Sequence, residues 1–234
     1  MRIAVIPARG GSKRIPRKNL RLFAGKPIIA YSIAAAQASA CFDRIIVSTD
    51  DEEIAAMARE LGAEVPFVRP SSLADDYTGT NAVVRHAIEW LNVGGTPPSH
   101  VCCIYATAPF VQSHFLSEGL ARLQASGKSF AFSVTSFPFP IQRAIRINVE
   151  GTVEAIQPEH SSTRSQDLEE AFHDAGQFYW GTAQAFLDNV SLFSPAALAI
   201  VLPRHLVQDI DTLEDWQRAE YMYQALQLSG EFTA

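Results

Sequence analysis

Cysteine is scarce in this chain, with three residues among 234. Cys41, Cys102 and Cys103 are too few and too unevenly placed to form a disulfide framework. Cys102 and Cys103 stand inside an apolar run, which predicts that both thiols are buried in the core. A chain of this length can bury a substantial core without cross-links, so we expect the fold to depend on packing.

Long apolar runs and an excess of basic residues are also missing. No run is long and apolar enough to span a bilayer, and Ile3 enters a predicted strand without a leader before it. The 19 Lys and Arg against 25 Asp and Glu give a formal net charge of -6, which argues against general nucleic-acid binding. We therefore expect a cytoplasmic protein with no membrane and no nucleic-acid partner.

The residues that are present favour a single α/β domain over 1–234. Apolar runs that predict strands alternate with helical spacing, which is typical of a Rossmann-like, mostly parallel sheet with helices on both faces. The predicted strands are 3–6, 43–50, 64–68, 101–105, 130–135, 177–180 and 199–202. The predicted helices are 26–39, with Pro27 at its start, and 51–61, 81–91, 115–124 and 213–228.

The alternation stops between residues 136 and 176. Phe137-Pro-Phe-Pro140 cannot continue a strand, because its two prolines remove backbone donors. Residues 145–156 alternate like a hairpin that turns at Glu150-Gly151, and a short helix is predicted around 167–172. The segment is too long for a simple loop, so we expect an inserted arm. A flexible excursion on a monomer is the alternative.

The densest motif is Ile6-Pro-Ala-Arg-Gly-Gly-Ser-Lys-Arg-Ile-Pro-Arg-Lys-Asn19, directly after the first predicted strand. Gly10 and Gly11 lack a Cβ, so the backbone can curl and present its N–H groups to a ligand. Five cations accompany this curl, and such a loop suits a polyphosphate. A solvated basic turn is the alternative. The motif is neither a Walker A loop, since no Gly-Lys-Ser/Thr closes it, nor a Gly-x-Gly-x-x-Gly fingerprint.

Two carboxylates stand two positions apart near the end of the chain, in Val207-Gln-Asp-Ile-Asp211. In an extended segment this spacing points both side chains to one face. Two such oxygens suit a magnesium ion that also holds phosphate oxygens. Alternatively, Asp211-Thr-Leu-Glu214 resembles a capping box for the last helix, although that would leave Asp209 unexplained. The residues alone leave both interpretations open.

These strings together resemble the signature of the CMP-sugar synthetases, the cytidylyltransferases that activate sialic acid and related acidic sugars. The resemblance implies that Asp209 and Asp211 hold Mg²⁺ near the α-phosphate of CTP, and that Arg9, Lys18 and Asp211 are catalytic. Residues 69–76 and Thr78-Gly-Thr80 look like the family segment that contacts cytosine and ribose, and a surface loop is the alternative. The implied CTP-binding positions are Ala8, Arg9, Gly10, Gly11, Ser12, Lys13, Lys18, Asn19, Arg69, Thr78 and Thr80.

The sugar half of the resemblance is more specific. Where the sialic-acid enzymes read Gln-Pro-Thr-Ser-Pro-Leu, this chain reads Tyr105-Ala-Thr-Ala-Pro-Phe110. Tyr105 replaces a glutamine that contacts the sugar, which should change the sugar accepted. Over nearly the whole chain the strings look most like the branch of the family that activates pseudaminic acid. The implied sugar contacts are Tyr105, Thr107, Arg143, Arg164, Gln177 and Tyr179.

The resemblance implies that the protein converts CTP and pseudaminic acid, a nonulosonic acid, to CMP-pseudaminic acid and pyrophosphate. It also implies a homodimer, in which the arm completes the sugar site of the partner. The alternatives are a synthetase for sialic, legionaminic or ketodeoxyoctonic acid, a non-catalytic nucleotide-binding module, and a nucleoside triphosphate hydrolase. No Ser-His-Asp arrangement can be assigned, so no hydrolase nucleophile is predicted. For the general base, a metal-bound hydroxide and Asp211 both stay open.

Overall fold

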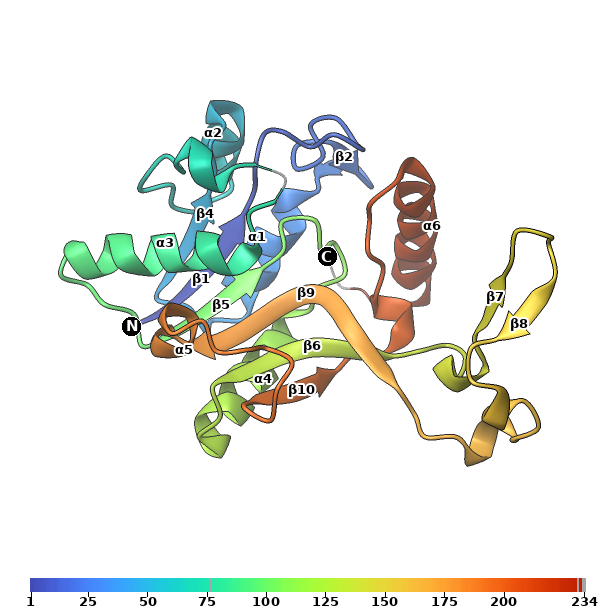
Figure 1. Cartoon of the computed structure of the whole chain (residues 1–234). Helices are drawn as coiled ribbons and strands as arrows, with labels where there is room; N and C mark the ends of the chain where they lie inside the picture. Colours follow the sequence, from blue (N-terminus) through green and yellow to red (C-terminus); the bar gives the residue numbers. More distant parts are fainter. Residues whose placement is uncertain (76, 231, 233–234) are drawn as a thin grey trace.

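A six-stranded sheet forms the centre of the computed structural model, which describes residues 1–75, 77–230 and 232 (Figure 1). The strands of the chain are β1 (Arg2–Pro7), β2 (Leu22–Phe23), β3 (Lys26–Pro27), β4 (Arg44–Ser48), β5 (His100–Ile104), β6 (Phe130–Ser136), β7 (Ile145–Ile147), β8 (Val153–Ala155), β9 (Phe172–Thr182) and β10 (Ala197–Val201). The sheet has the order β10-β6-β9-β5-β1-β4. Its neighbours pair in parallel except for β9, which runs antiparallel to β5 and β6, so the predicted mostly parallel sheet is confirmed.

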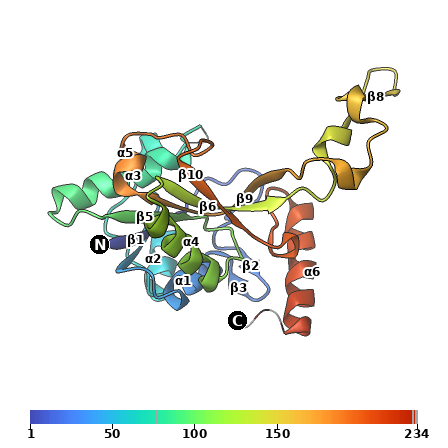
Figure 2. The ribbon, with the colours of Figure 1, turned by 90° about the horizontal axis from the view of Figure 1, so that it is seen from below.

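Helices cover both faces of this sheet, because successive side chains of a strand point to opposite sides. In β1, Ala4 and Ile6 join one buried cluster, and Ile3 and Val5 join another. Figure 2 shows α1, α2 and α4 on one side of the sheet and α3 and α5 on the other. The helices are α1 (Ile29–Ala38), α2 (Glu52–Glu60), α3 (Thr80–Val93), α4 (Ser113–Ser126), α5 (Ala183–Leu187) and α6 (Leu213–Ser229). No helix in the described ranges is long and apolar enough to cross a membrane.

A cluster of aromatic rings fastens α6 to the N-terminal part of the chain. Phe23 lies at its centre, with ring centroids 5.5 Å from Tyr31, 5.7 Å from Trp216 and 5.4 Å from Tyr223, all edge-on. Such pairs contribute about 0.5–1.5 kcal/mol each beyond the area they bury. The basic loop directly precedes Phe23, and Asp211 directly precedes α6. The cluster therefore brings the two ends of the chain together.

Three sequence predictions for the N-terminal half need correction. The helix predicted from residue 26 begins at Ile29, because Lys26 and Pro27 pair with β2 in a small hairpin. The predicted strand 64–68 is reduced to one parallel bridge between Glu64 and Ile46. The strand predicted over 101–105 is buried as expected, but one of its two neighbours, β9, is antiparallel.

The interruption of the alternation is a segment that leaves the body between β6 and β9 and ends in a projecting hairpin (Figure 1). Its hairpin pairs β7 with β8, and Gly151 in the turn has φ 78°, as the predicted Glu150-Gly151 turn requires. The helix predicted around 167–172 is wrong, since a 3₁₀ turn at Ser165–Asp167 is followed by extended chain. The excursion is shorter than predicted, because β6 ends at Ser136 and β9 begins at Phe172.

Candidate active site

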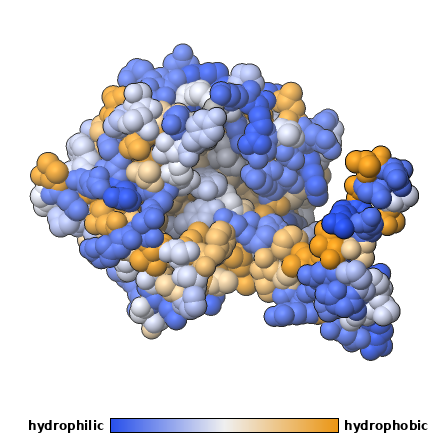
Figure 3. Space-filling view, in the orientation of Figure 1, coloured by the Kyte–Doolittle hydropathy of each residue, from blue (hydrophilic) through white to orange (hydrophobic). Residues whose placement is uncertain are grey.

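A cavity of about 480 Å³ opens at the carboxyl ends of β1 and β5. This is the edge at which parallel α/β sheets bind ligands. In Figure 3 the molecular face is hollowed between these strand ends and α6. The loop after β1, the segment after β5, the start of α3 and the segment before α6 all line this cavity. Its lining includes the predicted site residues Arg9, Ser12, Lys13, Lys18, Asn19, Thr80, Tyr105, Thr107 and Asp211.

The basic loop and the acidic pair meet across this cavity. Arg14 Nη2 lies 2.8 Å from Asp211 Oδ1, and Lys18 Nζ lies 3.8 Å from the same oxygen. The capping alternative for Asp211 is wrong: Thr212 caps α6 and exchanges hydrogen bonds with Asp215 in a capping box. The side chain of Asp211 therefore faces the loop cations, from which it is separated by almost 200 sequence positions.

The five cations of the loop do not all serve the cavity. Arg17 instead forms a two-pronged ion pair with Asp51 and a second ion pair with Glu53 at 2.6 Å. The φ of Arg17 is 54°, a left-handed conformation that these contacts hold in place. Asp51 also caps α2 by accepting from the N–H of Ile54, and the hydrogen bond from Arg17 lowers the pKa of its carboxyl. Arg17 and Asp51 thus anchor the loop to the body.

Three other predicted loop residues shape the backbone. The Gly10 N–H donates to Asp50 Oδ1 at 3.1 Å, and the N–H of the buried Ala8 donates to the carbonyl of Ser48 at 2.9 Å. Asn19 is buried and donates to the carbonyl of Arg9 at 2.9 Å. These contacts hold the turn in a single shape. Gly11, by contrast, has nothing near its Cα on the side where a Cβ would stand.

The predicted base-reading segment is only partly at the cavity. Thr80 lines it, whereas the side chain of Thr78 donates to the carbonyl of Ser72 at 3.3 Å. Arg69 is buried and spends its guanidinium on the carbonyl and the hydroxyl of Ser48, and burial lowers the pKa of Arg69 to about 10. Arg69 therefore holds the end of β4 in place through its hydrogen bonds to Ser48. Asp76, the last residue of that segment, lies outside the described residues.

A second cavity, of about 610 Å³, adjoins the first and shares Tyr105 with it. Asp209 lines this second cavity, whereas Asp211 lines the first, so the two carboxylates straddle the boundary between them. The buried Ile210 separates them in sequence and fixes the segment. Partial desolvation and, to a smaller extent, the charge of Asp211 raise the pKa of Asp209.

Two tyrosines line the second cavity, and one of them, Tyr105, also lines the first. The rings of Tyr105 and Tyr179 lie 5.2 Å apart, and Tyr179 donates its hydroxyl to Asp174, whose oxygens are 2.8 and 2.9 Å away. Desolvation by burial raises the pKa of both phenols, so both stay neutral hydrogen-bonding groups. A third cavity of about 510 Å³ shares Tyr105, Tyr179 and Asp174 and also reaches Thr80.

Three predicted sugar contacts lie away from these cavities in this chain. Gln177 is buried and donates to the carbonyl of Leu206, so its amide already has a structural partner. Arg143 donates to Ser165 at 3.2 Å, and Arg164 pairs with Asp167 at 2.7 Å, both within the projecting segment. Arg14, which contacts Asp211, had no individual role predicted from the sequence and was one of the five loop cations.

The two carboxylates at the boundary between the first and second cavities, Asp209 and Asp211, fit a magnesium ion. No cluster of three or more His, Cys, Asp or Glu residues suited to a metal occurs within the described ranges. Magnesium in phosphate-handling sites is typically bound by one or two carboxylates, with substrate oxygens and water completing the shell. Asp209 and Asp211 supply two hard oxygen ligands beside a cavity lined by cations that suit phosphates. A bound cation would favour the ionised form of Asp209, which partial desolvation and the nearby charge of Asp211 disfavour.

The chain is similar in sequence and in fold to known proteins. Residues 3–189 match the family model described as cytidylyltransferase. The chain is 47% identical over 221 residues to the pseudaminic acid cytidylyltransferase of Campylobacter jejuni, covering 94% of this chain and 95% of that protein. It is 34% identical over 228 residues to the CMP-N,N'-diacetyllegionaminic acid synthase of Legionella pneumophila, covering 93% and 94% of the two chains. A solved structure of CMP:2-keto-3-deoxy-manno-octonic acid synthetase complexed with CTP aligns with a TM-score of 0.69 and 14% identity, covering 96% of this chain and 98% of that one, which is a likeness of fold.

Proposed function

The chain belongs to the cytidylyltransferase family, and we propose that it transfers the cytidylyl group of CTP to pseudaminic acid and releases pyrophosphate. The observation that carries this proposal is the meeting of the cationic loop with Asp211 in one cavity.

The choice of sugar is supported by sequence identity, which is 47% to the pseudaminic acid relative and 34% to the legionaminic acid relative. The resemblance inferred from the sequence motifs points to the same branch.

The first cavity has the chemistry for the triphosphate. Arg9, Lys13 and Lys18 present positive charge to it, and Ser12 adds a hydroxyl donor. Charge-assisted hydrogen bonds of this kind are about twice as strong as neutral ones. Negative charge grows on the departing pyrophosphate during the reaction. We assign Arg9 and Lys18 the task of stabilising it, because prearranged charge is effective in such a transition state.

The second cavity would hold the sugar acid, with its anomeric hydroxyl directed past Tyr105 toward the α-phosphorus. That oxygen forms the new bond to phosphorus while the bond from phosphorus to the pyrophosphate oxygen breaks. The proton of the hydroxyl must be taken up as the bond forms. Asp211 lies at the boundary of the two cavities and is our candidate to accept it. Positioning of the two substrates by these cavities supplies much of the rate enhancement.

Magnesium would be held by Asp209 and Asp211 together with phosphate oxygens. When bound, it would neutralise phosphate charge and act as a Lewis acid at the α-phosphate. In the structure Arg14 and Lys18 contact Asp211. These cations orient its carboxylate toward the first cavity. Triphosphate oxygens compete for the same cations, so nucleotide binding would free Asp211 to serve as a ligand.

We also propose that the chain works as a homodimer through its projecting segment. Residues of this segment expose apolar side chains to solvent, including Phe139 at 80%, Ile147 at 71% and Val153 at 64%. Figure 3 shows this hydrophobic colour at the root and tip of the segment. Exposed apolar patches of this kind mark interaction surfaces. A partner subunit would bury them and would receive Arg143 and Arg164 near its own sugar cavity. Phe139→Glu with Ile147→Glu should shift the sedimentation coefficient from dimer to monomer, and an unchanged value would reject this assignment.

The substrate experiment separates the candidate functions. Purified protein with Mg²⁺ and CTP is given pseudaminic, legionaminic, sialic or ketodeoxyoctonic acid, and pyrophosphate release is measured. We expect turnover with pseudaminic acid to exceed that with each other sugar acid by at least about 10-fold, since a changed polar contact discriminates strongly. CTP binding without product would indicate a nucleotide-binding module, and sugar-independent cleavage of CTP a hydrolase. We also propose that the protein acts in the cytoplasm, where CTP is synthesised.

A further inference from the structure

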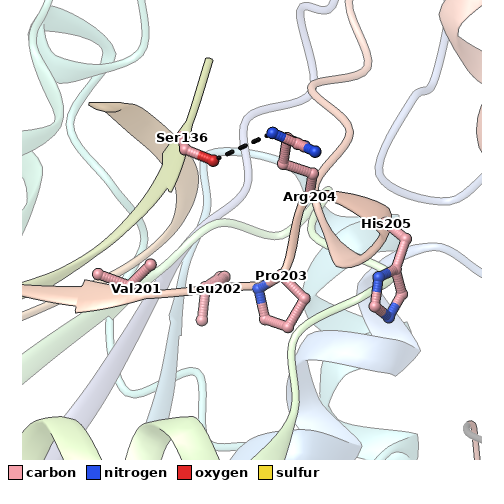
Figure 4. Close-up of a pocket in the computed structure, with 6 residues that line it drawn as sticks. All are labelled: Ser136, Val201, Leu202, Pro203, Arg204 and His205. Carbon is pink, nitrogen blue, oxygen red and sulfur yellow. Dashed lines mark hydrogen bonds between the residues drawn. The ribbon is translucent and has the colours of Figure 1, made fainter. Parts of the chain in front are cut away.

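The second cavity is lined by a cation to which no role has been assigned. Arg204 begins the short 3₁₀ turn Arg204–Leu206, which follows β10 and leads to the segment of Asp209. Its Nη1 donates to the hydroxyl of Ser136 at 3.4 Å, and no ion pair joins it to a carboxylate among the residues that the structure describes. Figure 4 shows the Arg204 side chain pointing toward Ser136 at the end of β6, while His205 points away. The charge of Arg204 is therefore available to a ligand.

Hydrogen bonds to its backbone hold the turn that carries Arg204 in place. The buried Gln177 of β9 donates to the carbonyl of Leu206, and the N–H of Val207 donates to the carbonyl of Arg204 at 3.1 Å. The bond to Leu206 gives the buried amide of Gln177 a structural partner away from the cavities. A turn held in this way presents its arginine at a defined place, which reduces the entropy lost when a ligand binds.

The chemistry of the proposed sugar substrate requires a cation at this place. In a 2-keto sugar acid, the ring carbon that carries the attacking hydroxyl also carries the carboxylate. When the hydroxyl approaches the boundary marked by Asp209 and Asp211, the carboxylate must lie in the second cavity within a few ångströms of it. Asp209 and Asp174 line the same cavity and repel a carboxylate there. A fixed positive charge in the wall of the cavity would offset that repulsion.

On the premise of the proposed function, we propose that Arg204 binds the carboxylate of the sugar acid and thereby orients its anomeric hydroxyl. The planar guanidinium can meet both carboxylate oxygens at once, and Ser136 holds it ready for them. The other arginine of this cavity, Arg218, is less suited. It lies on α6 near Asp215, whose pKa is lowered by hydrogen bonds from Thr212 and, to a smaller extent, by the charge of Arg218.

The test compares Arg204→Met and Arg204→Lys with the wild type, using pseudaminic acid and its C1 carboxamide as sugar substrates. Arg204→Met should raise KM for pseudaminic acid by about 10- to 100-fold, the range expected for a lost charge-assisted bond, while KM for CTP changes less than about twofold. Arg204→Lys should recover part of the loss, because it keeps the charge and loses the fork. Arg122→Met, on the far helix α4, serves as the control and should behave as the wild type.

The carboxamide separates recognition of the carboxylate from a general disturbance of the cavity. The wild type should prefer the acid over the amide by about the same 10- to 100-fold, and Arg204→Met should lose this preference. An Arg204→Met variant that still prefers the acid as strongly as the wild type overturns the assignment, as does an equal rise in KM for both substrates. Failure of the proposed function gives a different result, since the wild type itself would then release no pyrophosphate from CTP and pseudaminic acid.

Discussion

Gly10→Ala should destabilise the basic loop far more than the addition of a single methyl group suggests. A Cβ built on Gly10 would lie 2.6 Å from Asp51 Oδ2 and 3.0 Å from Asp51 Cβ. The Asp51 carboxylate cannot retreat freely, because Arg17 grips both of its oxygens and its Oδ1 accepts the capping bond from Ile54 at 3.0 Å. Relief of the clash therefore requires the loop to shift or the carboxylate to abandon its partners.

The size of the effect follows from these two routes. Overpacking of a tight contact costs about 1–3 kcal/mol, and loss of a helix cap costs about 0.5–2 kcal/mol. In a chain of this length, 1 kcal/mol corresponds to about 2–4 °C in Tm, so we expect a fall of about 2–10 °C. A displacement of the loop by about 1 Å would reduce kcat/KM for CTP by about 100-fold, since Arg9 is adjacent to Gly10 and Lys18 belongs to the same loop.

Thermal unfolding and pyrophosphate release measure the two effects. Gly11→Ala is the matched control for stability, because a Cβ at Gly11 meets nothing within 4 Å. Asp51→Ala removes the obstructing carboxylate, so adding Gly10→Ala to it should cost much less than in the wild-type background, an interaction that a double-mutant cycle detects. If Gly10→Ala unfolds at the same temperature as Gly11→Ala and keeps its kcat/KM, the close approach to Asp51 has been misread.

Other consequences are testable in simpler ways. Asp211→Asn should lower kcat by at least about 100-fold while the circular dichroism spectrum is kept, and chelation of divalent metal should abolish wild-type turnover reversibly; undiminished turnover in either case would contradict the metal assignment. Because Arg17 lowers the pKa of the Asp51 carboxyl, its ion pair stabilises the fold above about pH 4 and is lost as the pH falls through the lowered value. The unfolding free energy of Asp51→Asn should accordingly fall short of that of the wild type near neutral pH and approach it in acid. The buried thiols of Cys102 and Cys103, whose pKa values burial raises, should react with a thiol reagent only as fast as the protein unfolds, and rapid labelling of the native protein would show the packing to be wrong.

The sequence alone shows the residue composition of each half of the site, whereas the roles assigned to those residues stay predictions. The basic loop and the Asp-x-Asp pair are each short and contiguous, so their composition and spacing survive in the linear chain. Their meeting depends on the packing of Phe23 against Trp216 and Tyr223, which are almost 200 positions away. Helical periodicity shows that α6 has an apolar face, but it does not show what covers that face. The resemblance to a known family supplied the pairing that the pattern could not.

Other roles could not be predicted from the sequence, because the type of a residue does not show which way its side chain points. Gln177 was predicted to contact the sugar, yet it lies on β9, whose antiparallel course among parallel neighbours was not expected. Its amide consequently supports the turn that carries Arg204. Arg17 could not be distinguished from the other loop cations, since only its left-handed backbone and its pairing with Asp51 reveal an anchor. Arg204 follows a proline in a stretch without a recognisable motif, and its place in the wall of the second cavity is what suggests a role.

The contact between Arg14 and Asp211, which spans 197 positions, also has a consequence for synthesis of the protein. Translation at about 5–20 residues per second separates the appearance of the two side chains by about 10–40 seconds. During that interval a growing polypeptide carries an exposed cationic turn but lacks the carboxylate that faces it. On the proposed role of Asp211, ribosome-bound and prematurely terminated fragments would lack activity, and activity in a cell extract would count only chains translated past Asp211.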